Sequence, residues 1–503
     1  MLRQVTVENG RLEGIPAADP RITAFKGVPF AAPPVCELRW KAPQPASNWE
    51  GVLKADAFGP MSMQNVHMSN HVGLYEREWL CEPEAPMSED CLYLNVWTPA
   101  MTGNEKYPVL VWYFGGALQM GAPNEMEFDG ERLARRGIIV VTINYRTNVF
   151  GFLCHPELRK ESPEAPCNFG NLDQQAATRW VKRNIAAFGG DPDRITIAGQ
   201  SAGGGSVMTQ ITSPQNEGLV QGAIIQSGIF TACYEERFRN YTPSQAEEQG
   251  VAFFDFLGVS SLKEARALDA VYVRDKMLAF NRFFGTVEDG NFHVGDNMTR
   301  FLENKRLQIP ILLGLTVDEF MEVPQVNSLA AFDQMANDIF GDQAEAYLAL
   351  CNRECGNLDE IKERAKTSSI AVAIHTMLRR SDELHNTMPN YFYCFGADIP
   401  GWDHPGAFHS VDLWFFFETL AKCWRPFVGK HYDLARVMCN YWAEFVKKGD
   451  PNGKDLDGSD MPEWTPYTKE APYAMLFKDT ALQALCPPDE LTSLWMMKKF
   501  GQS

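Results

Sequence analysis

The stretch ITIAGQSAGGGSV, residues 195–207, carries the strongest local signal in this chain of 503 residues. Its first half alternates apolar residues like a short buried strand, and the small residues that follow predict a sharp turn into a helix. Residues 199–203 match G-x-S-x-G, a motif in which a serine lies on a strained strand-to-helix turn and glycines avoid side-chain clashes. A glycine-rich turn with a helix-capping serine would also match, so the rest of the chain has to separate the two interpretations.

The composition is that of a globular protein with a large buried core. Of the 503 residues, 45% are hydrophobic and 22% are charged, and no linker, repeat or low-complexity tract divides the chain. One large domain over residues 1–503, with insertions, is therefore expected. The 64 acidic and 46 basic residues give a net charge of −18, which argues against nucleic-acid and anionic-membrane partners because both are negatively charged.

Targeting signals and metal motifs are missing from the sequence. The N-terminal MLRQVTVENGRLEG lacks the apolar segment of a secretory signal, and no run approaches the ~18 apolar residues of a membrane span. Twelve cysteines are scattered without C-x-x-C or Cys/His spacing. Reduced thiols in a cytoplasmic protein explain this cysteine pattern. A secreted protein whose signal peptide had been removed would show the same N-terminal sequence. No metal or cofactor is expected, and a monomer and a dimer are both compatible with the chain.

Strand and helix patterns alternate along the chain, which predicts a largely parallel, doubly wound α/β sheet. An amphipathic helix closed by glycines is expected at 172–190. Two long mixed stretches, about 230–305 and 322–388, predict helical insertions that cap the carboxyl edge of the sheet, where open α/β sheets bind ligands. The predicted buried strands are residues 91–99, 107–116, 137–146, 195–200, 222–228, 309–316 and 391–396.

A reactive serine on such a turn needs a base and a carboxylate that orients the base. With this motif the order along the chain is serine, carboxylate, histidine, each in a loop after a sheet strand. The strand predicted at 309–316 is followed by Asp318 and Glu319, so the carboxylate is expected to be one of these two. The last predicted strand is followed by His404 and His409, and spacing alone favours His409 only weakly.

The serine also needs N–H donors for an oxyanion. The segment WYFGGALQMG, residues 112–121, follows an early predicted strand and contains a Gly-Gly-Ala sequence that lets the backbone approach a ligand closely. We expect the N–H groups of Gly116, Ala117 and Ala202 to converge on one oxygen. A plain glycine turn is the alternative.

Several blocks of the chain resemble the type-B carboxylesterases, a family with the α/β-hydrolase fold, and in particular its bacterial para-nitrobenzyl esterases. FGGDPDRITIAGQSAG, residues 188–203, matches the family's serine signature, and EDCLYLNVWTP, residues 89–99, matches its second signature. GLTVDEF resembles the acid loop and selects Glu319, whereas AFHSVDLWFFF, residues 407–417, resembles the histidine loop and selects His409. The resemblance extends from residue 2 to about residue 480.

This resemblance implies a cofactor-independent serine esterase that acts on small-molecule esters. Ser201 would attack the carbonyl, His409 would take the proton and return it to the alcohol, and Glu319 would hold the imidazole. Small acyl, aryl and hydroxycinnamoyl-type esters are all compatible. Two alternatives are acyl transfer by the same triad and a catalytically silent adhesion protein of the same fold; the latter class loses the serine that this chain keeps.

The resemblance also assigns residues around the reactive group. Phe280 and Phe284 are expected on the acyl side of the pocket. Gln200, where the family usually has glutamate, is expected in a buried network behind the serine together with Ser227 and Asp412. Two ion pairs are expected to be structural, Arg39 with Glu89 and Arg146 with Asp173.

One departure from the family bears on the substrate. Cholinesterases carry a tryptophan that stacks on choline ten residues before the position of Cys91, and this chain has Cys81 there. Because a quaternary ammonium would lose its aromatic face, cholinesterase activity is not expected. Trp79, two residues away, is the nearest aromatic substitute in the sequence, and a Cys81–Cys91 disulfide remains an open alternative.

Overall fold

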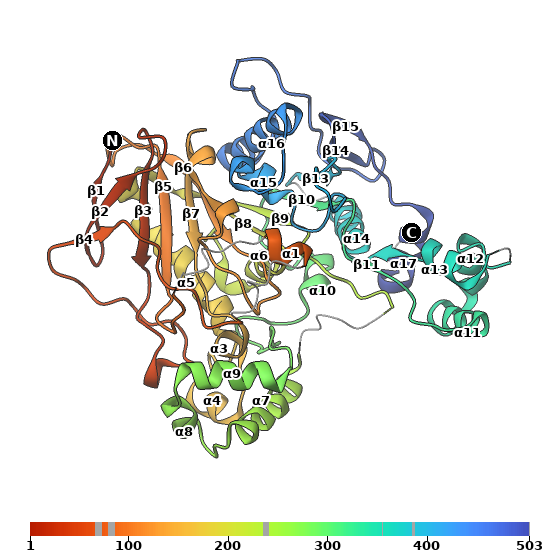
Figure 1. Ribbon diagram of the computed structural model, residues 1–503, viewed down its shortest axis with the longest axis horizontal. Coiled ribbons are helices and arrows are strands. Elements are labelled where there is room, and N and C mark those ends of the chain that lie inside the picture. Colours follow the sequence, from red (N-terminus) through yellow and green to blue (C-terminus); the bar gives the residue numbers. More distant parts are fainter. Residues whose placement is uncertain (66–72, 79–85, 235–240, 355, 385–387, 502–503) are drawn as a thin grey trace.

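One 13-stranded sheet organises the computed structural model, which describes residues 1–65, 73–78, 86–234, 241–354, 356–384 and 388–501 (Figure 1). Its strands are β1 (Gln4–Val7), β2 (Gly10–Pro16), β3 (Thr23–Pro29), β4 (Val52–Ala55), β5 (Tyr93–Thr98), β6 (Tyr107–Tyr113), β7 (Ile139–Ile143), β8 (Gly190–Gln200), β9 (Gly222–Gln226), β10 (Ile311–Thr316), β13 (Asn390–Phe395), β14 (Tyr473–Phe477) and β15 (Ala481–Leu485).

The spatial order of the strands is β1-β2-β3-β5-β7-β6-β8-β9-β10-β13-β14-β15, and β4 pairs with β2. The strands from β7 to β14 in this order run parallel, whereas both ends of the sheet are antiparallel. All seven predicted strands are present, shorter or longer by a few residues. The largely parallel sheet therefore confirms the predicted α/β class.

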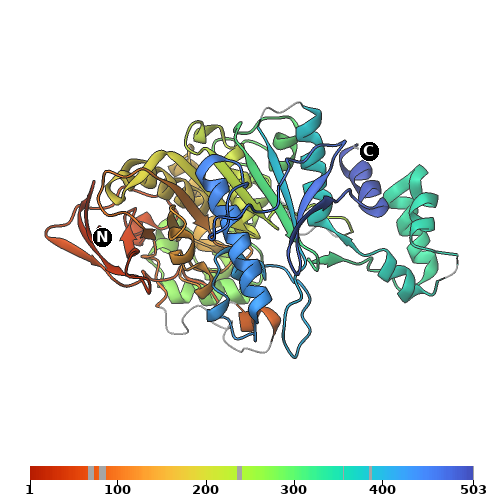
Figure 2. The same cartoon turned by 90° about the horizontal axis from the view of Figure 1, so that it is seen from above.

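Helices cover both faces of the sheet. Figure 2 shows α5 (Phe169–Asn184) and α16 (Gly429–Lys448) on opposite sides of the central strands. Each helix buries a tryptophan completely against the sheet, Trp180 from α5 and Trp442 from α16. The predicted helix at 172–190 is α5, but it ends at Asn184 because a short 3₁₀ turn follows and the closing glycines lead into β8.

The two predicted insertions are helical, and they lie in different places. The first contributes α7 (Pro243–Leu257), α8 (Leu262–Ala267) and α9 (Ala270–Phe280), which lie below the sheet in Figure 1, and α10 (Asn297–Leu302). The second contains α11 (Leu329–Phe340), α12 (Ala344–Leu350), α13 (Leu358–Arg364) and α14 (Ser369–Glu383). Helices α11–α13 project at the right of Figure 1 and share a hydrophobic cluster with α17 (Glu490–Phe500) around Trp495.

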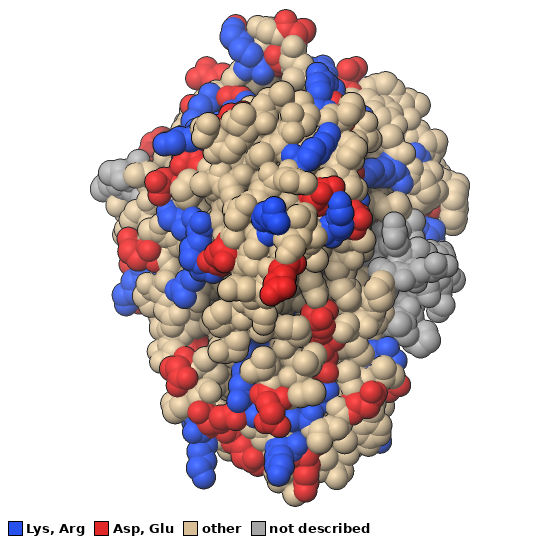
Figure 3. Space-filling model, turned by 90° about the vertical axis from the view of Figure 1, so that its left-hand side faces the viewer, with Lys and Arg blue, Asp and Glu red and all other residues tan. Residues whose placement is uncertain are grey.

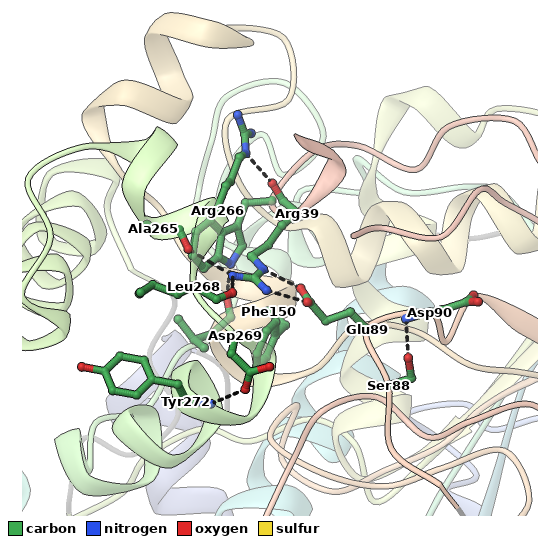
Figure 4. A network of polar contacts seen from close by, with 12 residues as sticks. Arg39, Ser88, Glu89, Asp90, Phe150, Ala265, Arg266, Leu268, Asp269 and Tyr272 are labelled. Carbon is green, nitrogen blue, oxygen red and sulfur yellow. Dashed lines mark hydrogen bonds and ion pairs between the residues drawn. The ribbon is translucent and has the colours of Figure 1, made fainter. Parts of the chain in front are cut away.

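Buried Arg39 connects the segment after β3 with Glu89, which precedes β5, and with the first insertion (Figure 4). Arg39 donates from Nε and Nη2 to the two carboxylate oxygens of Glu89, each at 2.6 Å. Its Nη1 donates to the carbonyls of Ala265 and Leu268, at 3.0 and 2.8 Å. The second expected pair, Arg146 with Asp173, is also formed, at 2.7 Å. Both pairs join segments that are separate in the sequence.

The surface carries charges of both signs. Lysine and arginine side chains alternate with aspartate and glutamate over the face that Figure 3 shows, with uncharged surface between them. Within the described residues, no helix has the length and hydropathy that crossing a bilayer requires.

Candidate active site

Ser201 lies at the turn between β8 and α6 (Ala202–Thr212). Its backbone has φ 55° and ψ −127°, a conformation that costs a residue with a side chain about 1–3 kcal/mol. The Ser201 N–H donates to the carbonyl of Gln226 at 2.9 Å, which ties the turn to β9. A Cβ at Gly199 would lie 2.4 Å from the backbone of Gly203, and one at Gly203 would lie 2.1 Å from the carbonyl of Tyr113. Side chains are therefore excluded at both motif glycines.

The structure brings His409 and Glu319 together from loops that follow β13 and β10. Nδ1 of His409 lies 2.6 Å from Oε2 of Glu319, and both side chains are only 1% exposed. The other carboxylate oxygen of Glu319 accepts the backbone N–H of Thr316 at 3.1 Å. Burial alone would raise the pKa of Glu319, but His409 and these hydrogen bonds outweigh it and hold the pKa below its usual value. Glu319 is therefore a stable anion beside the imidazole.

The competing pair, Asp318 and His404, is arranged differently. Both side chains are exposed. The Asp318 carboxylate accepts the backbone N–H of Ala407 at 2.7 Å, so it braces the loop that carries His409. The backbone N–H of His404 donates to the carbonyl of Gly401, and within the described residues its imidazole forms no hydrogen bond or ion pair with either carboxylate of the acid loop. Geometry thus favours Glu319 and His409 over their neighbours.

Three backbone N–H groups belong to residues that line the cavity together with the serine. Gly116 and Ala117 adopt positive φ values of 103° and 56°, in the loop after β6, and Ala202 is the first residue of α6. All three residues line the same cavity as Ser201. Among the described residues, no hydrogen bond uses these N–H groups, so they are available to an oxygen atom in the cavity. The positive end of the α6 dipole adds to their preference for negative charge.

Gln200 contacts the imidazole directly. Its side-chain amide nitrogen lies 3.2 Å from Nε2 of His409, and the glutamine is 2% exposed. No hydrogen bond joins the Ser201 hydroxyl to His409 in the described residues, although both side chains line the cavity. Catalytic hydrogen bonds are often long in the absence of substrate and tighten in the complex. In this arrangement Gln200 occupies the imidazole nitrogen that would otherwise face the serine.

A buried polar layer lies behind Glu319. The Asp412 carboxylate accepts the Tyr393 hydroxyl at 2.7 Å and the Gln226 amide at 3.3 Å, both on Oδ2. Burial, opposed by the Tyr393 hydrogen bond and reinforced by the charge of Glu319, raises the pKa of Asp412 to about 6. Ser227 is fully buried beside Glu319 and contributes to the low pKa of that carboxyl. Gln200, Ser227 and Asp412 therefore all lie around the His409–Glu319 pair.

The reactive groups open into a cavity of about 680 Å³. One part of its wall is apolar and aromatic, including Tyr75, Phe230, Phe283 and Phe320, of which Phe320 packs against the His409 ring with centroids 4.4 Å apart. Other wall residues come from α6, α10 and the end of α17. A cavity of this size and lining suits a small organic molecule.

Not every predicted pocket residue reaches this cavity. Phe284 is buried in a second hydrophobic cluster, and Phe280 packs against that cluster rather than forming part of the cavity wall. Phe283, between them, supplies the wall instead, because successive residues after α9 point in different directions. Trp79 and Cys81 lie outside the described residues, and Cys91 is a buried free thiol among the described ones.

The wall residues that the sequence analysis missed differ in whether the sequence contains a signal for their position. Phe320 follows Glu319 directly, so its position beside the acid was available from the sequence. Lys499 and Phe500 come from the other end of the chain, and only the packing of α17 brings them to the cavity. Within the described residues, no group of three or more His, Cys, Asp or Glu side chains is arranged to hold a metal ion.

Comparison with known proteins identifies the family of the chain. A family model described as "Carboxylesterase family" matches residues 2–485. The chain is similar to the para-nitrobenzyl esterase of Bacillus subtilis (strain 168), with 31% identity over 493 residues that cover 93% of each chain. It is also similar to the acylcarnitine hydrolase of Mus musculus, with 32% identity over 489 residues that cover 90% of this chain and 83% of the mouse protein.

Solved structures give the same result. The Geobacillus stearothermophilus carboxylesterase EST55 superposes with a TM-score of 0.77 and 31% identity, covering 98% of this chain and 100% of that chain. A structure of PNB esterase superposes with a TM-score of 0.78 and 28% identity, covering 98% and 99% of the two chains.

Proposed function

Because this chain belongs to the carboxylesterase family and is a carboxylic ester hydrolase, we propose that it acts through an acyl-enzyme formed on Ser201. The likeness to solved carboxylesterases also confirms the predicted α/β-hydrolase fold. The single observation that carries the mechanism is the alignment of a strained serine, a buried imidazole and a buried carboxylate around one cavity.

In the proposed first step, Ser201 attacks the ester carbonyl while His409 accepts its proton at Nε2. Glu319 holds the Nδ1–H of the imidazole and stabilises the positive charge that develops on the ring. For this to happen, the Gln200 amide has to give up its contact with Nε2 as the serine hydroxyl approaches. His409 then returns the proton to the departing alcohol, and a water molecule releases the acid by the reverse sequence.

The carbonyl oxygen becomes negatively charged in the tetrahedral intermediate. The N–H groups of Gly116, Ala117 and Ala202 are the proposed donors, because all three line the cavity and are otherwise unused in the described chain. Fixed donors of this kind contribute about 2.7–4 kcal/mol each to transition-state stabilisation.

We assign the substrate as a small-molecule carboxylic ester with an apolar or aromatic part. The aromatic wall of the cavity supports this assignment, as do relatives named para-nitrobenzyl esterase and acylcarnitine hydrolase. Small acyl, aryl and hydroxycinnamoyl-type esters all fit a cavity of about 680 Å³.

The test is the Ser201→Ala variant assayed on para-nitrophenyl esters and treated with an organophosphonate. We expect a loss of roughly 10⁴–10⁶-fold in kcat with the fold retained, because triad members act as one unit. The organophosphonate should label Ser201 in the parent and nothing in the variant. Label on Ser227, or variant activity above about a hundredth of the parent, would contradict the proposal. Adding a competing alcohol to the assay separates hydrolysis from acyl transfer by the products formed.

A further inference from the structure

The cavity is elongated along one face of α6. Gly205, Met208 and Thr209 all line it, and they follow Ser201 at the spacing that places residues on one side of a helix. With a rise of 1.5 Å per residue, the wall extends roughly 12 Å from Ser201 to Thr209. A substrate bound at Ser201 therefore has room for a long substituent that runs beside α6.

The far end of this wall is polar and charged. Helix α10 packs against α6, which brings Asp296 and Asn297 to this end of the wall. Lys499 of α17 also lines the cavity, and its charge acts on Cys233, which follows the wall residues 230–232. Asn297 is fully engaged, since its Nδ2 donates to Thr209 at 2.8 Å and its Oδ1 accepts from Thr212 at 2.8 Å. The aspartate and lysine side chains in the cavity wall are Asp296 and Lys499.

These two charged groups differ in how far they are already satisfied. Asp296 caps α10, and its carboxylate accepts the backbone N–H of Thr299 at 2.7 Å. The Lys499 side chain is exposed, its Nζ lies 5.8 Å from the centroid of Trp495, and no carboxylate of the described chain forms an ion pair with it. Trp495 is fully buried and anchors this end of α17. The cavity wall thus includes a cation that forms no ion pair with any carboxylate in the described part of the chain.

We propose that Lys499 selects esters that carry an anionic group, such as a carboxylate, on the part of the substrate that lies against this lysine in the cavity. The inference rests on the proposed function, because it takes Ser201 as the position of the ester carbonyl. The overall charge of −18 would repel an anion at long range. At physiological salt, however, charges more than about 8 Å away are largely screened, so the nearest cation decides.

The experiment compares two para-nitrophenyl esters of equal length, the octanoate and the hydrogen suberate, which adds a terminal carboxylate. A second pair of substrates places the carboxylate on the alcohol side of the ester. In this pair the acetate ester of a long-chain ω-hydroxy acid is compared with the acetate ester of the matching alcohol. We expect Lys499→Gln to lower kcat/KM for the anionic ester about fivefold in one of the two pairs. Activity on its neutral partner should not change. Lys499→Arg should retain the preference, and added salt should weaken it.

Lys498→Gln is the matched control, since this lysine is an exposed neighbour in the last turn of α17 that does not belong to the cavity wall. It should leave both ratios unchanged. Asp296→Asn keeps a helix-capping side chain and should raise kcat/KM for the anionic ester by removing repulsion. Equal effects of the two lysine variants, or no change of either ratio with Lys499→Gln, would overturn the inference. If turnover of the octanoate ester persists in the Ser201→Ala variant, it is the proposed function that is overturned.

Discussion

The amide nitrogen of Gln200 lies 3.2 Å from Nε2 of His409, although the two residues are 209 positions apart in the chain. Nδ1 of the same ring is held by Glu319 at 2.6 Å, so both imidazole nitrogens are engaged before any substrate is present. The carboxylate would stabilise the protonated ring, whereas the neutral amide adds no charge. This contact makes Gln200 the residue whose substitution most directly tests the electrostatics of the site.

Gln200→Glu should move the acidic limb of the kcat/KM profile to higher pH. A glutamate carboxylate at this distance from Nε2 would favour the protonated imidazole, which cannot act as a base. The measurement is a pH–rate profile on one neutral ester. Gln200→Met, which has a similar size and no charge, should leave the limb in place. A limb that moves to lower pH in Gln200→Glu would contradict the electrostatic argument.

Substitutions in the acid and histidine loops should separate the two candidate pairs. We expect His409→Ala and Glu319→Gln to lower kcat by at least about 10³-fold, because both touch the charge that develops on the imidazole. His404→Ala and Asp318→Asn should cost less than about tenfold. Steady-state kinetics on a para-nitrophenyl ester, with circular dichroism as the control for folding, gives the comparison. A severe loss with His404→Ala would show that the wrong histidine has been assigned.

Asp412 should make stability fall as pH rises through the mildly acidic range. The pKa of Asp412 is about 6 in the folded protein, whereas an aspartate outside the folded environment has a pKa of 3.8. The folded state therefore holds the proton more tightly than the unfolded state. The contribution of Asp412 to stability is complete below about pH 4 and is lost as pH rises to about 6. Asp412→Asn cannot titrate, and its amide oxygen can accept from both Tyr393 and Gln226.

Relative to the parent, the free energy of unfolding of Asp412→Asn should therefore increase between these pH values by up to about 3 kcal/mol. Urea unfolding of both proteins at a series of pH values measures the difference. Parallel stability curves would show that Asp412 has an ordinary pKa in the folded protein.

Removing the buried Arg39 side chain should destabilise the protein far more than removing an exposed arginine. Arg39→Met leaves Glu89, whose side chain is 9% exposed, without its cation, and we expect the free energy of unfolding to fall by about 3–5 kcal/mol. Arg21 also pairs with an aspartate, but its side chain is 70% exposed, so Arg21→Met should cost less than about 1 kcal/mol. Urea unfolding followed by tryptophan fluorescence measures both, and equal losses would contradict the distinction.

The sequence by itself determined the parts of this protein that depend on neighbouring residues. The turn at Ser201 is readable because Gly199 and Gly203 are required by backbone contacts within a few residues of the serine and with the adjacent β6 strand. The buried strands are readable because parallel strands covered on both faces are continuously apolar. Resemblance of the loops to known ones then selected Glu319 and His409, and the structure brings these two within hydrogen-bond distance.

Tertiary structure decided what depends on packing between distant segments. Spacing favoured His409 over His404 only weakly, since the difference between them is burial: His409 is 1% exposed and His404 lies on the surface. Phe283 rather than Phe280 or Phe284 reaches the cavity because the direction of a side chain after α9 depends on the contacts of that loop. Lys499 joins the same wall because α17, at the other end of the chain, packs against α12 and α14. Local backbone sterics are determined by a short stretch of sequence, whereas contacts between side chains hundreds of residues apart form only when the core packs.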